Sequence, residues 1–136
     1  MSETRFVLDT NVLVSAALFK NSIGRQAFNK AVVDGRILMS EPVWAELQDV
    51  FSRSRFDKYL SVDLRTAFLT DLLAVVGQVE ITEAISVCRD PKDDKFLELA
   101  LSGRATYILS SDKDLLVLQP FQEIEILAPA DFLAAY

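Results

Sequence analysis

Residues 6–13 of the chain are Phe6-Val7-Leu8-Asp9-Thr10-Asn11-Val12-Leu13. Large apolar residues run directly into a carboxylate, which is typical of a short strand buried on both faces of a parallel sheet. Asp9 would then follow the carboxyl end of that strand, where open parallel sheets bind their ligands. Because a lone buried carboxylate is costly, we expect a cation or other polar groups to compensate it.

The composition favours a single domain, which we expect to span residues 1–136. Hydrophobic residues make up 51% of the 136 residues, which is enough for a sizeable core and unlike a disordered chain. No apolar run approaches the roughly 20 residues that cross a bilayer, so we expect no membrane contact.

The available side chains limit the chemistry. The chain has no histidine, which excludes Ser-His-Asp triads and histidine metal sites. The single Cys88 allows neither an internal disulfide nor a zinc cluster, and it agrees with a cytoplasmic location. The net charge of −6 argues against general attraction to nucleic acid but permits a local basic strip.

Strand-like and helix-like segments alternate along the chain. The expected order is strand 6–8, helix within 12–19, helix 22–34, strand 37–39, helix 41–53, helix 61–76, strand 79–81, helix to 102, strand 106–109, strand 124–127 and a helix after 129. This alternation predicts an α/β fold with three layers, α/β/α, around a central parallel sheet.

Glu46 breaks the pattern of the helix at 41–53. Val43, Leu47 and Val50 form an apolar stripe, and Glu46 falls on the same stripe. Such violations of amphipathic patterning are expected at functional sites. The alternative, which periodicity weighs equally, is that Glu46 lies at the edge of the stripe and reaches water.

A second acidic stretch surrounds Pro91. Asp90 precedes the proline and is expected to be extended. Asp93 shares the inward face of three apolar residues that follow it at helical spacing, so it is our preferred site residue. Asp94 lies on a more mixed face and is the alternative for the same position. Acidic residues also favour helix N-termini for structural reasons alone.

Residues 105–116 repeat the opening pattern. An apolar strand runs into Ser110, Ser111 and Asp112, so Asp112 also lies just beyond a carboxyl end. Asp114 has a structural explanation, because Ser111 and Asp114 are spaced like a capping box.

The four selected acids are expected to converge at one end of the sheet: Asp9, Glu46, Asp93 and Asp112. Carboxylates packed together at neutral pH repel one another unless cations bind or protons are taken up. Oxygen ligands without histidine or thiolate suit Mg²⁺ or Mn²⁺. A carboxylate-bound cation activates water and neutralises charge on a phosphoryl group, which favours phosphodiester hydrolysis.

Residues 53–59 form a local basic cluster with interleaved aromatic residues. Arg53, Arg55 and Lys58 could hold phosphates while the aromatic rings stack on bases. The plainer interpretation is that these basic residues form a solvated face.

Nearly the whole chain resembles the PIN domain, and more closely its toxin branch related to VapC ribonuclease toxins. The resemblance is carried by Leu8-Asp9-Thr10-Asn11-Val12-Leu13, Glu46 in its helix, Asp90-Pro91-Lys92-Asp93-Asp94 with the helix that follows, and Ser110-Ser111-Asp112-Lys113-Asp114-Leu115. The family usually has threonine near the position of Ser110, which is a conservative difference.

The resemblance implies a magnesium-dependent endoribonuclease that cleaves single-stranded RNA as the toxin of a toxin–antitoxin pair. It implies catalytic and metal-binding roles for Asp9, Glu46, Asp93 and Asp112. Asn11 would brace the loop of Asp9, and a hydroxyl of Ser110 or Ser111 would orient Asp112. Asp90, Asp94 and Asp114 are the remaining supporting candidates. A homodimer and an antitoxin partner that blocks the site are also implied.

Two other functions are consistent with the same residues. One is a phosphatase of the haloacid-dehalogenase type with Asp9 as nucleophile, although those enzymes usually carry a second acid where this chain has Asn11. The other is a catalytically silent PIN-like module that acts as an interaction partner.

Overall fold

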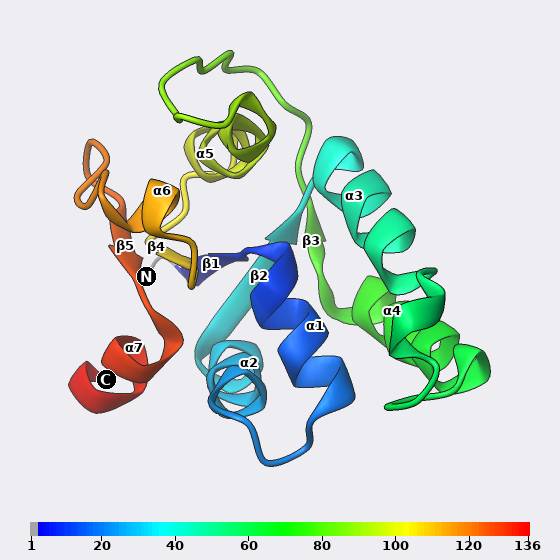
Figure 1. Cartoon of the computed structure of the whole chain (residues 1–136). Helices are drawn as coiled ribbons and strands as arrows, with labels where there is room; N and C mark the ends of the chain where they lie inside the picture. Colours follow the sequence, from blue (N-terminus) through cyan, green and yellow to red (C-terminus); the bar gives the residue numbers. More distant parts are fainter. Residues whose placement is uncertain (1–2) are drawn as a thin grey trace.

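The protein, for which a computed structural model describes residues 3–136, is built on a five-stranded sheet (Figure 1). The strand order is β3-β2-β1-β4-β5, and each pair of neighbours is parallel. The strands are β1 (Thr4–Leu8), β2 (Gly35–Met39), β3 (Gly77–Gln78), β4 (Tyr107–Leu109) and β5 (Glu125–Leu127).

Helices cover both faces of the sheet. They are α1 (Thr10–Leu18), α2 (Ile23–Asp34), α3 (Glu41–Phe51), α4 (Val62–Val75), α5 (Asp94–Ser102), α6 (Lys113–Leu116) and α7 (Pro129–Ala135), with short 3-10 turns η1 (Ser54–Phe56) and η2 (Pro91–Asp93). Figure 1 shows α5 above the sheet, α1, α2 and α7 below it, and α3 and α4 on the side of β3. The predicted three-layer α/β/α fold is confirmed.

The first strand is buried on both faces, as its sequence predicted. Phe6, Val7 and Leu8 are 1%, 0% and 2% exposed. Side chains that alternate between the two faces of a strand can all be buried only when both faces are covered. β1 therefore lies at the centre of the core, between β2 and β4.

The order of the strands reverses between β1 and β4. The chain moves from β1 to β2 and β3 on one side, and then returns to β4 and β5 on the other. Leu8 pairs with Leu109 in register, so the carboxyl ends of β1 and β4 lie side by side. Such a switch point is where sheets of this type bind ligands.

Three predicted helix starts are confirmed. The hydroxyls of Ser22, Ser40 and Ser61 accept hydrogen bonds from backbone N–H groups in the first turns of α2, α3 and α4. Each cap satisfies a donor that the helix itself leaves without a partner. α1 begins at Thr10, earlier than predicted, because the Asp9 side chain accepts from the N–H of Val12 and caps it.

Two local predictions are wrong. The strand predicted at residues 79–81 is β3 of the structure, and it is formed by Gly77–Gln78 instead. Asp112, and not Ser111, caps α6, because the Asp112 side chain accepts from the N–H of Asp114. A carboxylate is as good a cap as a hydroxyl, so spacing alone did not decide between them.

Gly35 allows α2 to pass directly into β2. A Cβ at this position would lie 2.0 Å from the carbonyl oxygen of Thr4 on the neighbouring strand. Only glycine permits this approach of the two backbones.

Arg65 is a buried charge that the apolar pattern of α4 did not indicate. It is 2% exposed, and its guanidinium donates to the carbonyl oxygens of Phe51 and Leu60 and to the carboxylate of Asp57. A buried guanidinium is tolerated when its donors are satisfied in this way. Arg65 thus fixes the connection between α3 and α4, which carries the basic cluster.

Among residues 3–136, no helix is long and apolar enough to cross a membrane.

Candidate active site

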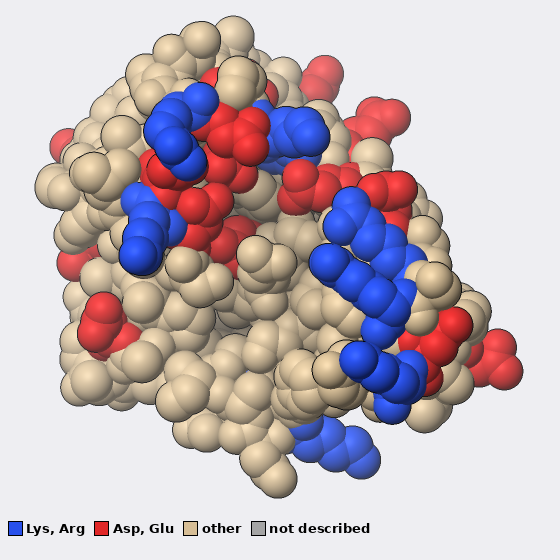
Figure 2. Space-filling view, viewed as in Figure 1, with Lys and Arg blue, Asp and Glu red and all other residues tan. Residues whose placement is uncertain are grey.

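A cavity of about 220 Å³ opens at the switch point, at the carboxyl ends of the strands. It is lined by Asp9, Thr10, Asn11, Glu46, Val50, Arg53, Asp93, Phe96, Asp112 and Leu115. All four acids selected from the sequence therefore reach one cavity, although they come from distant parts of the chain. Figure 2 shows acidic side chains gathered on this face, with basic side chains on either side of them.

Asp9 lies at the buried side of the cavity and is 4% exposed. One carboxylate oxygen accepts from the N–H of Val12 at 2.9 Å. The other accepts from the hydroxyl of Ser110 and from the N–H of Ser111 at 3.3 Å. Burial raises the pKa of Asp9, while these hydrogen bonds act in the opposite direction.

Ser110 joins the carboxyl ends of β1 and β4. Its fully buried hydroxyl donates to the Asp9 carboxylate and accepts from the N–H of Asp112 at 2.9 Å. The family resemblance implied that a hydroxyl of Ser110 or Ser111 would orient Asp112. In the structure the Ser110 hydroxyl contacts the Asp112 backbone and also orients the Asp9 side chain, and Ser111 contributes its N–H group to Asp9.

Asp93, Asp112 and Asp114 form the closest group of acids. A carboxylate oxygen from each lies within 4.8 Å of the others. Burial and then the charge of Asp112 raise the pKa of Asp93 to about 7. Three carboxylates at this spacing repel one another, and a divalent cation would relieve that repulsion.

Asp94 and Asp93 have different surroundings. Asp94 is buried, and one of its oxygens accepts from the N–H groups of Cys88 and Val87 at 2.9 and 3.2 Å. The Cys88 N–H is the main reason why the pKa of Asp94 is lowered. Asp94 therefore holds the preceding loop, whereas Asp93 lines the cavity. Asp90 is exposed and extended, and its side chain accepts from the N–H of Lys92.

Glu46 has two partners that the sequence did not indicate as site residues. Its Oε1 lies 2.7 Å from the ammonium Nζ of Lys95, and its Oε2 accepts from the Thr10 hydroxyl. Lys95 lies four residues before the buried Leu99, on the inward side of α5. A lysine on the inward face of a helix requires an acidic partner, so the helical position of Lys95 in the sequence could have indicated such a pair.

The basic cluster extends from the cavity along the α3–α4 connection. Arg53 lines the cavity and pairs with Asp49 at 3.2 Å. The Arg55 guanidinium carbon lies 4.8 Å from the centre of the Phe56 ring, and the Lys58 Nζ lies 5.1 Å from that of Tyr59. All three basic side chains are exposed. Asn11 is also exposed and lines the cavity.

The donor set fits a hard divalent cation. The cavity is lined by carboxylates, a threonine hydroxyl and an asparagine amide. These oxygen ligands suit Mg²⁺ and Mn²⁺ and are poor ligands for softer metals. Burial, and after it the charge of Asp112, raises the pKa of Asp93, and a bound divalent cation would lower it again.

Comparisons with known proteins agree with the fold. A family model described as the PIN domain matches residues 5–114. The uncharacterized protein MJ1680 of Methanocaldococcus jannaschii is 28% identical over 117 residues, which cover 85% of this chain and 75% of that protein.

Two solved structures are similar over most of their length. A chain in the complex of VapBC2 from Rickettsia felis, bound to a DNA fragment from its promoter, has a TM-score of 0.61 and 14% identity and covers 90% of this chain and 97% of its own. PAE2754 from Pyrobaculum aerophilum has a TM-score of 0.59 and 15% identity, with 98% and 91% covered. At these identities the two structures support the fold alone.

The pKa of Asp93 predicts how the stability of the metal-free protein depends on pH. Folded Asp93 holds a proton up to about pH 7, whereas in the unfolded chain it would lose it near its ordinary value of 3.8. Stability should therefore fall as pH rises through this interval. Asp93→Asn should flatten the fall and raise the melting temperature at pH 7.5 in EDTA by a few degrees.

The neighbouring Asp94→Asn is the matched control. It weakens the hydrogen bonds to residues 87 and 88, so it should lower the melting temperature at pH 7.5 while the decline between pH 4 and 7 remains. Thermal melts followed by circular dichroism check both variants. If the stability of Asp93→Asn fell with pH as steeply as that of the unmodified protein, the raised pKa would not belong to Asp93.

Proposed function

This chain belongs to the PIN-domain family, and we propose that it is a divalent-cation-dependent endoribonuclease that cleaves single-stranded RNA. The observation that carries the proposal is the convergence of Asp9, Glu46, Asp93 and Asp112 on one cavity at the switch point of the sheet. Family membership supports a nuclease in general, and the acidic cavity supports its dependence on a cation.

Asp93, Asp112 and Asp114 would hold the cation, because their oxygens are the closest group. When bound, the cation supplies positive charge against the phosphodiester and makes water more acidic. Asp9 orients this end of the site through its bonds to residues 110 and 111, and it adds negative charge that favours the cation. Phe96 and Leu115 form an apolar wall of the cavity that limits the access of bulk water.

Arg53, Arg55 and Lys58 would bind the backbone of the RNA. Arg53 at the cavity and the other two further along the connection form a basic path that leads to the acids. Exposed basic and aromatic side chains of this kind bind single strands with little dependence on sequence. The preference for RNA over DNA in this proposal rests on the resemblance to VapC-like ribonucleases.

The biological role that we propose is that of a cytoplasmic toxin controlled by an antitoxin, and acting as a homodimer. The similarity to a chain of the VapBC2 complex supports this role at the level of the fold. An antitoxin would have to cover the cavity or supply a group to it in order to inhibit cleavage.

The geometry disfavours the phosphatase alternative. Both oxygens of Asp9 accept hydrogen bonds from the protein, and the side chain is 4% exposed. A nucleophile must present a free oxygen to the phosphorus. The silent-module alternative makes a different prediction, which is binding without cleavage.

Cleavage of a mixed-sequence single-stranded RNA tests the proposed activity. We expect products with Mg²⁺ or Mn²⁺ and none with EDTA. Asp93→Asn should reduce the rate about 100-fold or more, because several kcal/mol of charge stabilisation depend on the cation. Asp71→Asn, the same change at an exposed acid on α4, is the matched control and should cleave normally. Binding of RNA without any cleavage would favour the silent module.

Binding of RNA to an Asp93→Asn protein tests the basic path without cleavage. Adding Arg55→Gln and Lys58→Gln should weaken binding and reduce the slope of log K against log salt by roughly 1.4, since each phosphate contact on a single strand contributes about 0.7. Fluorescence anisotropy between low and moderate salt measures this slope.

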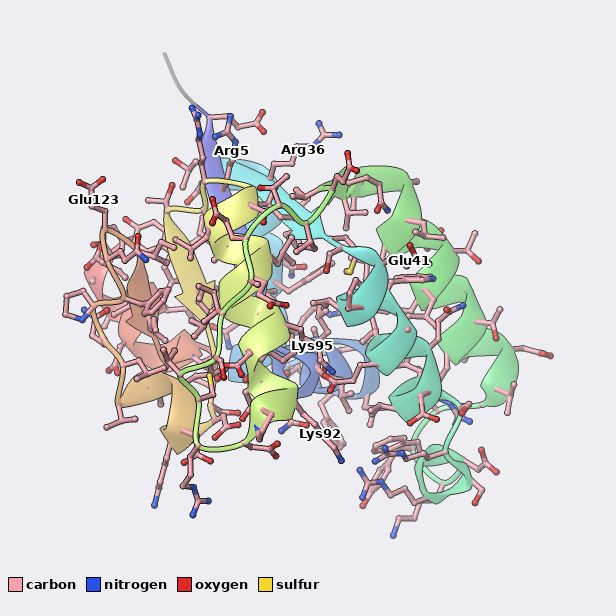
Figure 3. The ribbon with its side chains drawn as sticks, turned by 90° about the horizontal axis from the view of Figure 1, so that it is seen from above. Arg5, Arg36, Glu41, Lys92, Lys95 and Glu123 are labelled. Carbon is pink, nitrogen blue, oxygen red and sulfur yellow. The ribbon has the colours of Figure 1, made fainter. Side chains whose placement is uncertain are left out.

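A second pair of basic residues provides the control. Figure 3 shows Arg5 and Arg36 at the end of the molecule away from Lys92 and Lys95. Arg5→Gln with Arg36→Gln removes the same charge and should leave the slope nearly unchanged. Equal effects of the two pairs would remove the basic path from the proposal.

A further inference from the structure

Lys95 is a cation that belongs to the protein and lies beside the acidic cavity. Lys95 belongs to the first turn of α5, and its side chain lies between α5 and α3 (Figure 3). Its ammonium is 2.7 Å from Glu46, and the two side chains are only 20% and 25% exposed. An ion pair that is this shielded from water is held more firmly than a pair on the surface.

Glu46 has no oxygen without a protein donor. Oε1 accepts from the Lys95 ammonium, and Oε2 accepts from the Thr10 hydroxyl. Glu46 is also absent from the group of carboxylates that lie within 4.8 Å of one another, which consists of Asp93, Asp112 and Asp114. The acids near the cavity thus include a close group of three aspartates and, apart from them, a glutamate that is paired with the Lys95 ammonium.

Asp114 differs from Glu46 in this respect. Its partner is Arg89, whose Nε lies 3.2 Å away and whose side chain is 86% exposed. A side chain so open to water gives up such a contact at little cost, because exposed ion pairs contribute about 0–1 kcal/mol. Asp114 is therefore available to a bound cation, whereas Glu46 is held by Lys95.

We propose that the cavity takes one divalent cation, and that the Lys95 ammonium fills the place on Glu46 that a second divalent cation would require. Two-metal sites hold their ions about 3.5–4 Å apart and need carboxylates for both. Here the carboxylate next to the close group carries an ammonium, which also repels a second dication. This inference rests on the cation of the proposed function and concerns the number of ions bound.

The experiment is a titration of the full chain with Mn²⁺, without RNA, in which free Mn²⁺ is measured by electron paramagnetic resonance. The unmodified protein should bind one ion. Lys95→Met keeps the length of the stem, removes the charge and frees Glu46, so it should bind two. Adding Glu46→Gln to Lys95→Met should return the number to one.

Arg89→Met is the matched control, because it removes the cation from the other ion pair. It should leave the number of bound ions at one. A circular-dichroism melt of each variant shows whether it is folded at the temperature of the titration. If Lys95→Met does not fold, Lys95→Gln removes the same charge with a polar side chain and should likewise bind two ions, whereas Lys95→Arg keeps the charge and should bind one.

Two ions in the unmodified protein would overturn the inference and leave the nuclease proposal intact. One ion in folded Lys95→Met would also overturn it, because Lys95 would then not be what limits the number. No ion in either protein would contradict both the inference and the cation dependence of the proposed function. The absence of RNA cleavage with one ion bound would contradict the function alone.

Discussion

The buried carboxylate of Asp9 is the interaction on which the rest of the site depends. It accepts hydrogen bonds from Val12 at the start of α1 and from Ser110 and Ser111 after β4. A carboxylate shielded from water in this way is tolerated because both of its oxygens have donors. These bonds fix the ends of the two central strands relative to each other, and the cavity forms at that junction.

The acids near this junction are not equivalent. The charge of Asp94 is stabilised by hydrogen bonds from backbone N–H groups, and this acid holds the loop before α5. Glu46 is paired with Lys95, whereas burial and then the nearby charge of Asp112 raise the pKa of Asp93. The charge that remains is concentrated in a small volume of the cavity. A site that must bind a cation reversibly needs such uncompensated charge, and its cost is lower stability of the metal-free protein.

The sequence was sufficient for the fold because each level of pattern pointed to the same arrangement. The apolar run at 6–8 and the alternation of strands with helices both predicted a parallel sheet with Asp9 at a carboxyl end. Helical periodicity predicted that Asp93 has the inward position and Asp94 a mixed face, and the burial is the reverse. Asp94 is the buried acid, whereas Asp93 precedes α5 and is half-buried where it lines the cavity. The spacing of apolar residues predicts which face of a helix or strand is buried, and it does so only for apolar side chains.

The pairing of charges could not be predicted in the same way. Lys95 and Glu46 are 49 residues apart in sequence, and Arg65 meets Asp57 and two carbonyl groups through a turn that has no regular pattern. Such contacts depend on how elements pack, and periodicity within one helix does not specify a partner on another.

The most direct test of the central claim is anomalous diffraction from crystals soaked in Mn²⁺. The account predicts Mn²⁺ in the cavity, bound by oxygens of Asp93 and Asp112. A cavity without Mn²⁺ at concentrations that saturate binding in solution would contradict it.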